Sequence, residues 1–197
     1  MRPIHRIIAV LALVLAGAAP ASAATYAIDP AHSSVNFKIK HLMVSWVHGK
    51  FNTFSGTFDY DPKNLRVWKT SVTIDAASID TGIEMRDKHL RSADFFDTAK
   101  YPALSFVMAT VTEGKAGAYA LTGNLTMHGV TKPVVLDLES GGTAKDPKGR
   151  THVGFSASAK LNRKDFGVAW NQDLKEGGVM IGEDVFITIE IDGILQP

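Results

Sequence analysis

The sequence predicts an all-β protein, an eight-stranded antiparallel barrel with a short capping helix. Two observations predict this fold class. Short segments with an apolar residue at every second position recur along the chain between turn residues, and one segment departs from this period of two. Because a period of two is typical of strands with one face against an apolar interior, eight such segments at short spacing indicate an up-and-down barrel.

The first residues of the 197-residue chain are expected to lie outside this fold. Two arginines precede an uncharged run over residues 7–19, and the run is followed by small residues from Ala21 to Ala23. This pattern is typical of a secretory signal peptide. We therefore expect cleavage after Ala23, export to the periplasm, and one domain over residues 24–197.

Composition excludes several classes of function. Without Arg2 and Arg6, the 21 basic residues fall below the 20 acidic ones, which leaves the exported protein with a formal charge near −1 and no electrostatic case for binding nucleic acid. The absence of cysteine excludes disulfides, thiolate metal sites and thiol nucleophiles. No second apolar run approaches the length of a membrane-spanning helix, so we expect no transmembrane segment in the mature chain.

The first two strands are expected over residues 35–40 and 54–60, where Gly56 indicates a bulge or bend. The connection between them, Leu42 to Gly49, is too long for a tight hairpin and too apolar to lie in water. We expect this connection to cover one end of the barrel.

The third strand is expected over Arg66 to Ala76, and the period then changes. Thr81 to Phe96 combines dense charge with apolar residues that do not alternate, and Thr81 and Glu84 have the spacing of a capping box. We expect a short helix with an exposed charged face, then a turn at Asp94, after which two phenylalanines return the chain to the core.

Five further strands are expected where the alternation resumes. They are Leu104 to Val111, Tyr119 to Met127, Val134 to Leu138, Val153 to Ala159 and Val185 to Ile191. A solvated loop is expected over residues 141–149, and the Gly-rich segment 162–183 is expected to cover an end of the barrel.

The interior of a barrel of this size is either filled by side chains or holds one small ligand. Ten phenylalanines and three tryptophans gather on the expected inner face and in the end loops, which favours a ligand. Aromatic residues on strands are also ordinary core residues, so composition leaves both interpretations open.

Sites for catalysis or metal binding are poorly supported. The histidines have neither the i,i+4 spacing of a zinc protease nor a thiol partner, and the serines at 33 and 34 lack a nucleophile elbow. The segment Arg86 to His89 offers an acid, a base and a cation, but a solvated helix face explains it equally well. His89 and Asp94 are candidates to orient a polar head group at the barrel mouth.

Four blocks of the chain resemble, in the same order, the signature blocks of the YceI-like family. They read HSSVNFKIKHLMVSWVHGKFNTFSGTFDYDP, RDKHLRSADFFDTAKYPALSF, LTGNLTMHGVTKPVVLDLE and NRKDFG. The resemblance covers Thr25 to the C-terminus. It implies a lipocalin-like barrel, capped by a helix, in an exported protein that holds a polyisoprenoid in its pore.

Alternation and position select the residues that we expect to line this pore. Within the matching blocks they are Phe37, Ile39, Phe58, Phe95, Phe96, Phe106, Leu125 and Phe166, and the same reasoning adds Ile74, Phe155 and Trp170.

We therefore expect a binding protein and not an enzyme, with an isoprenoid lipid or isoprenoid quinone as a non-covalent ligand and with no cofactor or metal. Each buried methylene contributes about 0.8 kcal/mol, so a few five-carbon units suffice for tight binding. A lipid-modifying enzyme and a stress-response barrel without a stable ligand are the alternatives. A transient contact with a membrane or a membrane protein is left open.

Overall fold

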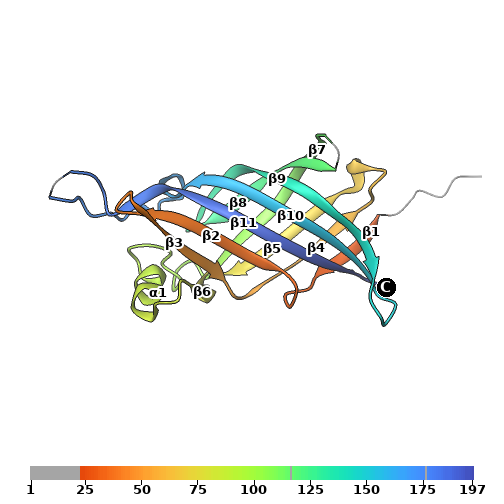
Figure 1. Cartoon of the computed structure of the whole chain (residues 1–197), viewed down its shortest axis with the longest axis horizontal. Coiled ribbons are helices and arrows are strands. Elements are labelled where there is room, and N and C mark those ends of the chain that lie inside the picture. Colours follow the sequence, from red (N-terminus) through yellow and green to blue (C-terminus); the bar gives the residue numbers. More distant parts are fainter. Residues whose placement is uncertain (1–22, 116, 176) are drawn as a thin grey trace, which may run out of the picture.

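The computed structural model describes residues 23–115, 117–175 and 177–197. The expected signal peptide, apart from Ala23, lies outside the described residues. The described part forms an elongated barrel, with the C-terminus at one end and the α-helix beside the other (Figure 1).

The secondary structure is dominated by strands. They are β1 (Ala24–Ile28), β2 (Ser34–His41), β3 (Ser45–Phe51), β4 (Phe54–Tyr60), β5 (Lys69–Asp75), β6 (Ile79–Asp80), β7 (Ala103–Glu113), β8 (Ala118–Met127), β9 (Val130–Lys145), β10 (Thr151–Asn162) and β11 (Ile181–Leu195). The helical elements are α1 (Glu84–Arg91) and the 3₁₀ turns η1 (Leu65–Val67), η2 (Ala76–Ser78) and η3 (Arg163–Phe166).

The sheet closes on itself. Over the described residues, the order β1-β4-β5-β7-β8-β9-β10-β11 is completed by pairing of β1 with β11, and every pairing is antiparallel. This closed eight-stranded antiparallel barrel with one short α-helix confirms the predicted fold class.

Three of the eight barrel strands are each built from two pieces. β1 and β2 pair in succession with β11, through Tyr26 with Leu195 and Val35 with Ile189. Next to them, β4 pairs with β1 and β3 pairs with β2; after these, β5 pairs with β4 and β6 pairs with β3. The two-piece strands are therefore β1 with β2, β4 with β3, and β5 with β6. The broken strands lengthen the barrel beyond the region where β1 closes it.

The prediction that Leu42 to Gly49 covers a barrel end was wrong. Most of this segment is strand β3, which forms a hairpin with β2 and pairs Gly49 with Phe37. The turn itself is short, and Leu42 and Met43 adopt φ values of 50° and 60°. Two consecutive left-handed residues suit the right-handed twist of a tight hairpin.

Two further local expectations were wrong. β4 and β5 pair without a register shift at Gly56, so this glycine is not a bulge. It instead permits close approach of the chains, because an added Cβ would overlap the carbonyl oxygen of Ser71. The loop expected over 141–149 begins later, since β9 continues to Lys145.

Helix α1 is anchored by charged side chains that we expected on its exposed face. The Thr81–Glu84 capping box was a wrong prediction, because Ile83 is the N-cap. Asp87, the buried residue of the helix, instead accepts hydrogen bonds from the amide and hydroxyl of Thr81. Arg91 donates to the carbonyl oxygen of Ile79 at 2.9 Å. Such bonds to backbone groups fix the helix beside β6.

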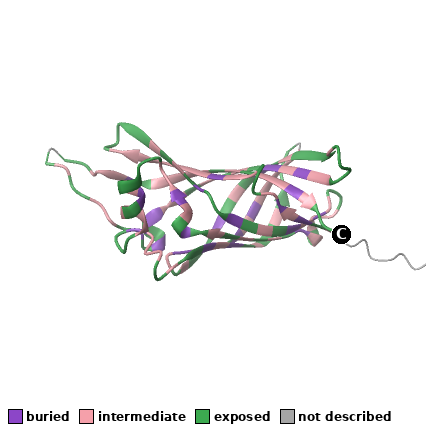
Figure 2. Cartoon of the chain, turned by 90° about the horizontal axis from the view of Figure 1, so that it is seen from below, coloured by how far each residue is buried: buried purple, intermediate pink, exposed green. Residues whose placement is uncertain are grey.

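The core lies along the inside of the barrel, where buried residues alternate with exposed ones on the strands (Figure 2). Ile79 and Val153 are fully buried. The core continues into a cluster of aromatic residues at the end of the barrel where the C-terminus lies (Figure 1), which we call the C-terminal end. The inside of the barrel is therefore the place to look for a binding site.

Candidate ligand-binding site

A cavity of about 720 Å³ occupies the barrel. This volume lies within the range of about 300–1,000 Å³ that is usual for small-molecule sites. On β11 its lining extends from Ile181 to Ile191, which corresponds to roughly 33 Å along a strand. The cavity is therefore a long tunnel.

Alternation explains why the tunnel wall is apolar. On β11 every second residue from Val185 to Ile191 faces the cavity, and β2 presents Val35, Phe37 and Ile39 to it. Since successive side chains of a strand point to opposite faces, Lys38 on β2 and Thr188 and Glu190 on β11 point out of the barrel.

Most of the side chains that we expected to line a pore do line this cavity. They are Phe37, Ile39, Phe58, Ile74, Phe95, Phe96, Phe106, Leu125, Phe155 and Trp170. Phe166, the last residue of η3, is placed differently: it is 2% exposed within the core cluster, and the cavity lining does not include it. The 3₁₀ turn ends the alternation of β10, so strand periodicity does not apply there.

The C-terminal end of the tunnel is filled by aromatic rings from several strands. The ring centroids of Tyr60 and Trp68 are 4.8 Å apart, those of Trp68 and Tyr119 are 4.9 Å apart, and those of Tyr60 and Phe155 are 5.1 Å apart. Nε1 of Trp68 donates to the carbonyl oxygen of Asp61 at 2.7 Å. Because these rings meet across the barrel, the tunnel ends blind here.

Burial of this aromatic end also affects ionisation. Burial raises the pKa of Tyr119, and the neighbouring Tyr60 raises it further. The phenol of Tyr119 therefore stays neutral within this aromatic cluster.

The opposite end lies between α1 and the segment before β11. Ile83 and Met85 on the helix side and Met180 on the other side line the cavity there. The ring centroid of His89 lies 5.0 Å from those of Phe95 and Trp170, which are 5.2 Å from each other. This end is the mouth of the tunnel.

The structure brings together the two polar residues that we expected at the mouth. Nε2 of His89 lies 2.8 Å from Oδ2 of Asp94, and His89 lines the cavity. Arg86, the cation of the same segment, is already engaged, because it donates to the hydroxyl and the carbonyl oxygen of Thr81.

Arg163 is a cavity-lining residue that sequence reasoning missed. It is 4% exposed, and its Nε and Nη1 donate to the carbonyl oxygens of Gly182 and Val168 at 2.8 and 2.7 Å. Burial lowers the pKa of its guanidinium. An arginine in a polar turn is usually exposed, so its sequence context does not indicate burial. Its place in the NRKDFG block, one of the four blocks that resemble the family, is the one feature of the sequence that could have singled it out.

A cluster of polar side chains around His152 lies away from the tunnel. At the C-terminal end, Nδ1 of His152 lies 2.7 Å from Oδ1 of Asp192, and its Nε2 lies 3.6 Å from Oδ2 of Asp146. Within the described residues, no group of three or more His, Asp or Glu side chains is arranged to hold a metal ion. The described helices also include none with the length and apolarity needed to cross a membrane.

Comparison with solved structures shows the same architecture in other proteins. BcnA of Burkholderia cenocepacia superposes with a TM-score of 0.73 at 25% identity, covering 84% of this chain and 98% of that chain. A Campylobacter jejuni YCEI protein gives 0.69 at 36% identity, over 81% and 91%. A polyisoprenoid binding domain from Saccharophagus degradans gives 0.64 at 17% identity, over 88% and 99%, and shares the fold.

Sequence comparison gives the family. Protein YceI of Escherichia coli O157:H7 is 42% identical over 187 residues, 94% of this chain and 94% of the relative. A UPF0312 protein of Vibrio cholerae is 42% identical over 160 residues, 80% of this chain and 85% of the relative. The model of the YceI-like domain matches residues 26–192, and on this evidence of sequence and fold the chain belongs to the YceI-like family.

Proposed function

We propose that this chain is an exported binding protein that holds a polyisoprenoid chain or an isoprenoid quinone in its barrel, for carriage or storage in the periplasm. The observation that carries the proposal is the apolar tunnel of about 720 Å³ with one aromatic, blind end. A structural neighbour described as a polyisoprenoid binding domain supports the same ligand class.

The shape and chemistry of the tunnel suit a long hydrocarbon chain. Burial of one five-carbon isoprene unit contributes on the order of 4 kcal/mol at about 0.8 kcal/mol per methylene, before ordering costs. A chain of several units cannot cross an aqueous compartment unaided, and a protein that covers it needs no chemistry to do so.

The polar groups of the tunnel favour binding over catalysis. Arg86 and Arg163 donate to backbone carbonyl oxygens, which holds them in place as structural groups. The pair of His89 and Asp94 at the mouth is the observation that keeps a lipid-modifying enzyme as the second candidate. Mass spectrometry of lipids before and after incubation separates the two, because an enzyme would release a lipid of altered mass.

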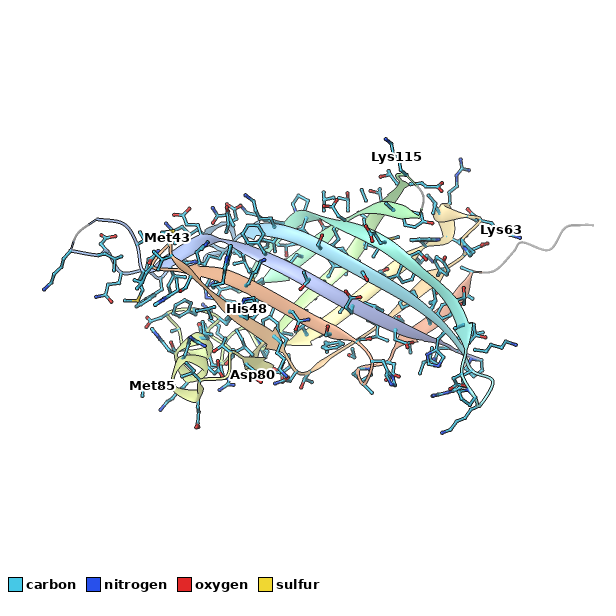
Figure 3. The ribbon with its side chains drawn as sticks, viewed as in Figure 1. Met43, His48, Lys63, Asp80, Met85 and Lys115 are labelled. Atoms are coloured by element: carbon cyan, nitrogen blue, oxygen red, sulfur yellow. The ribbon has the colours of Figure 1, made fainter. Side chains whose placement is uncertain are left out.

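The mouth is also suited to exchange of lipid with a bilayer. Val44 on the β2–β3 turn is 79% exposed and Met85 on α1 is 82% exposed. Figure 3 shows Met43 and Met85 at the same end of the barrel. The amide of Leu42 donates to the carbonyl oxygen of Met180, a cavity-lining residue, so the exposed apolar turn is continuous with the tunnel mouth.

Native mass spectrometry of protein purified from the periplasmic fraction tests the proposal. We expect a co-purified lipid of isoprenoid mass and a polypeptide that begins at Ala24. A ligand-free protein that also fails to take up added prenyl quinone would overturn the carrier function and favour a barrel without a stable ligand. Retention of residues 1–23 would overturn export by cleavage.

A further inference from the structure

The guanidinium of Arg163 has one nitrogen that the fold does not use. Nε and Nη1 bind the carbonyl oxygens of Gly182 and Val168, which fixes the plane of the group. Nη2 is buried and has no hydrogen-bond partner among the described residues. A buried donor without an acceptor is costly, and such groups are rare unless a ligand or water completes them.

The positive charge of Arg163 also lacks a bonded counter-charge. Glu183 is the acid whose charge acts on it, but this carboxylate accepts from Nζ of Lys164 at 2.6 Å and from Nδ2 of Asn162 at 3.3 Å. Among the described residues, no carboxylate lies within ion-pair distance of Arg163. A buried cation that faces only carbonyl oxygens favours a further oxygen, and an anionic one most.

The position of Arg163 makes the tunnel the source of that oxygen. The side chain lines the cavity, and its backbone partners are Gly182 at the start of β11, beside the mouth, and Val168 in the segment after η3. A structural role in joining η3 to this segment accounts for Nε and Nη1. It does not account for Nη2.

We propose that Nη2 of Arg163 binds an oxygen of the ligand's polar head, and that the site ranks an anionic oxygen above a neutral one and a neutral oxygen above a hydrocarbon end. The inference rests on the proposed function and deepens it. It also orients the ligand: the head lies at the mouth beside Arg163, and the apolar tail runs toward Trp68 at the blind end.

A matched series of C20 prenyl compounds tests the ranking. Geranylgeranoic acid, geranylgeranyl monophosphate, geranylgeraniol and the corresponding hydrocarbon differ in the head alone, and affinities are measured by competition with a fluorescent fatty acid. A charge-assisted hydrogen bond predicts that the acid or the phosphate binds at least about tenfold more tightly than the hydrocarbon. The acid and phosphate arms distinguish a carboxylate from a phosphate head.

Variants identify the residue responsible. Arg163→Met is expected to reduce the preference for an anionic head to less than about threefold and to leave hydrocarbon affinity unchanged. Lys164→Met is the control, because this neighbouring cation is exposed and pairs with Glu183 outside the tunnel. It is expected to retain the wild-type ranking.

Each outcome decides between the two proposals. Equal affinity of the wild type for all four compounds overturns the role of Arg163 while the proposed function stands, and so does a preference that survives in Arg163→Met. Failure of every chain to bind overturns the proposed function, and this inference with it. The ranking of head groups is measured on the wild type, so it is tested even when Arg163→Met does not fold.

Discussion

The ring of Phe37 lies directly over Gly49, its partner across the β2–β3 hairpin. An added Cβ at Gly49 would overlap the ring, so the glycine makes the space in which Phe37 rests against the wall. The rings of Phe106 and Phe58 lie over Gly123 and Gly193 in the same way. Large rings placed over glycines of the sheet leave the bore open.

Replacement of Gly49 tests this relationship. Gly49→Ala is expected to push the Phe37 ring into the tunnel, to lower ligand uptake, and to cost about 1–3 kcal/mol of stability as overpacking does. Lipid uptake and urea unfolding measure the two effects. Gly154→Ala is the control, since an added Cβ there would meet its nearest atom at 3.9 Å. Normal uptake by Gly49→Ala would contradict the arrangement.

Removal of the Phe37 ring should affect binding more than folding. Phe37 is half-buried and faces the cavity, so its packing is incomplete without ligand. Phe37→Ala is expected to lose affinity, with a stability loss below the 3–5 kcal/mol that is typical for deletion of a fully packed ring. Thermal melting and lipid uptake are compared with Lys38→Ala on the opposite face. A large drop in melting temperature in lipid-free protein would indicate a packed core.

The blind end should set the length of the bound chain. Trp68→Ala removes the ring that joins Tyr60 to Tyr119, so the tunnel is expected to lengthen and to shift preference toward longer prenyl chains. The loss of the buried indole is expected to cost about 3–5 kcal/mol. Native mass spectrometry with a mixture of chain lengths reads out the shift. Trp46→Ala, at a partly exposed site on β3, should leave the length distribution unchanged.

Exposed apolar residues at the mouth should control exchange with membranes. Val44→Glu is expected to slow transfer of a fluorescent prenyl lipid from vesicles by an order of magnitude, because a carboxylate opposes insertion into the bilayer interface. Its melting temperature should not change. Val135→Glu is the matched control, since Val135 is 53% exposed on the barrel wall. Equal transfer rates for the two variants would argue against docking through the mouth.

The His152 cluster should make stability depend on pH. The hydrogen bond to Asp192 raises the pKa of His152 above its ordinary value of 6.5. A group whose pKa is raised on folding adds stability that is complete below the unfolded pKa and is lost as pH rises through the folded one. The stability difference between wild type and His152→Gln should therefore shrink as pH rises above 6.5, as measured by urea unfolding at each pH. A difference that grows with pH would contradict this assignment; His48→Gln, at an exposed site on β3, is the control.

The local sequence determines much of the barrel and of its lining. The alternation on β2 and on β11 determines which side chains share a face, and this placed Phe37 and Ile39 at the cavity without knowledge of the topology. The family blocks added the closure into a barrel and the expectation of an isoprenoid ligand. The alternation depends on near neighbours in the chain, which is why a sequence pattern reports it.

The tertiary structure alone decided the remaining features. The pairing of β1 and β2 in succession with β11 joins segments more than a hundred residues apart, so no local period contains it. The blind end exists because rings from separate strands meet across the bore. Arg163 acquires its unpaired nitrogen through burial against Gly182 and Val168. Desolvation of a charge depends on which distant parts of the chain pack around it. The local sequence of a polar turn does not indicate those contacts, so the burial of Arg163 could not be predicted from it.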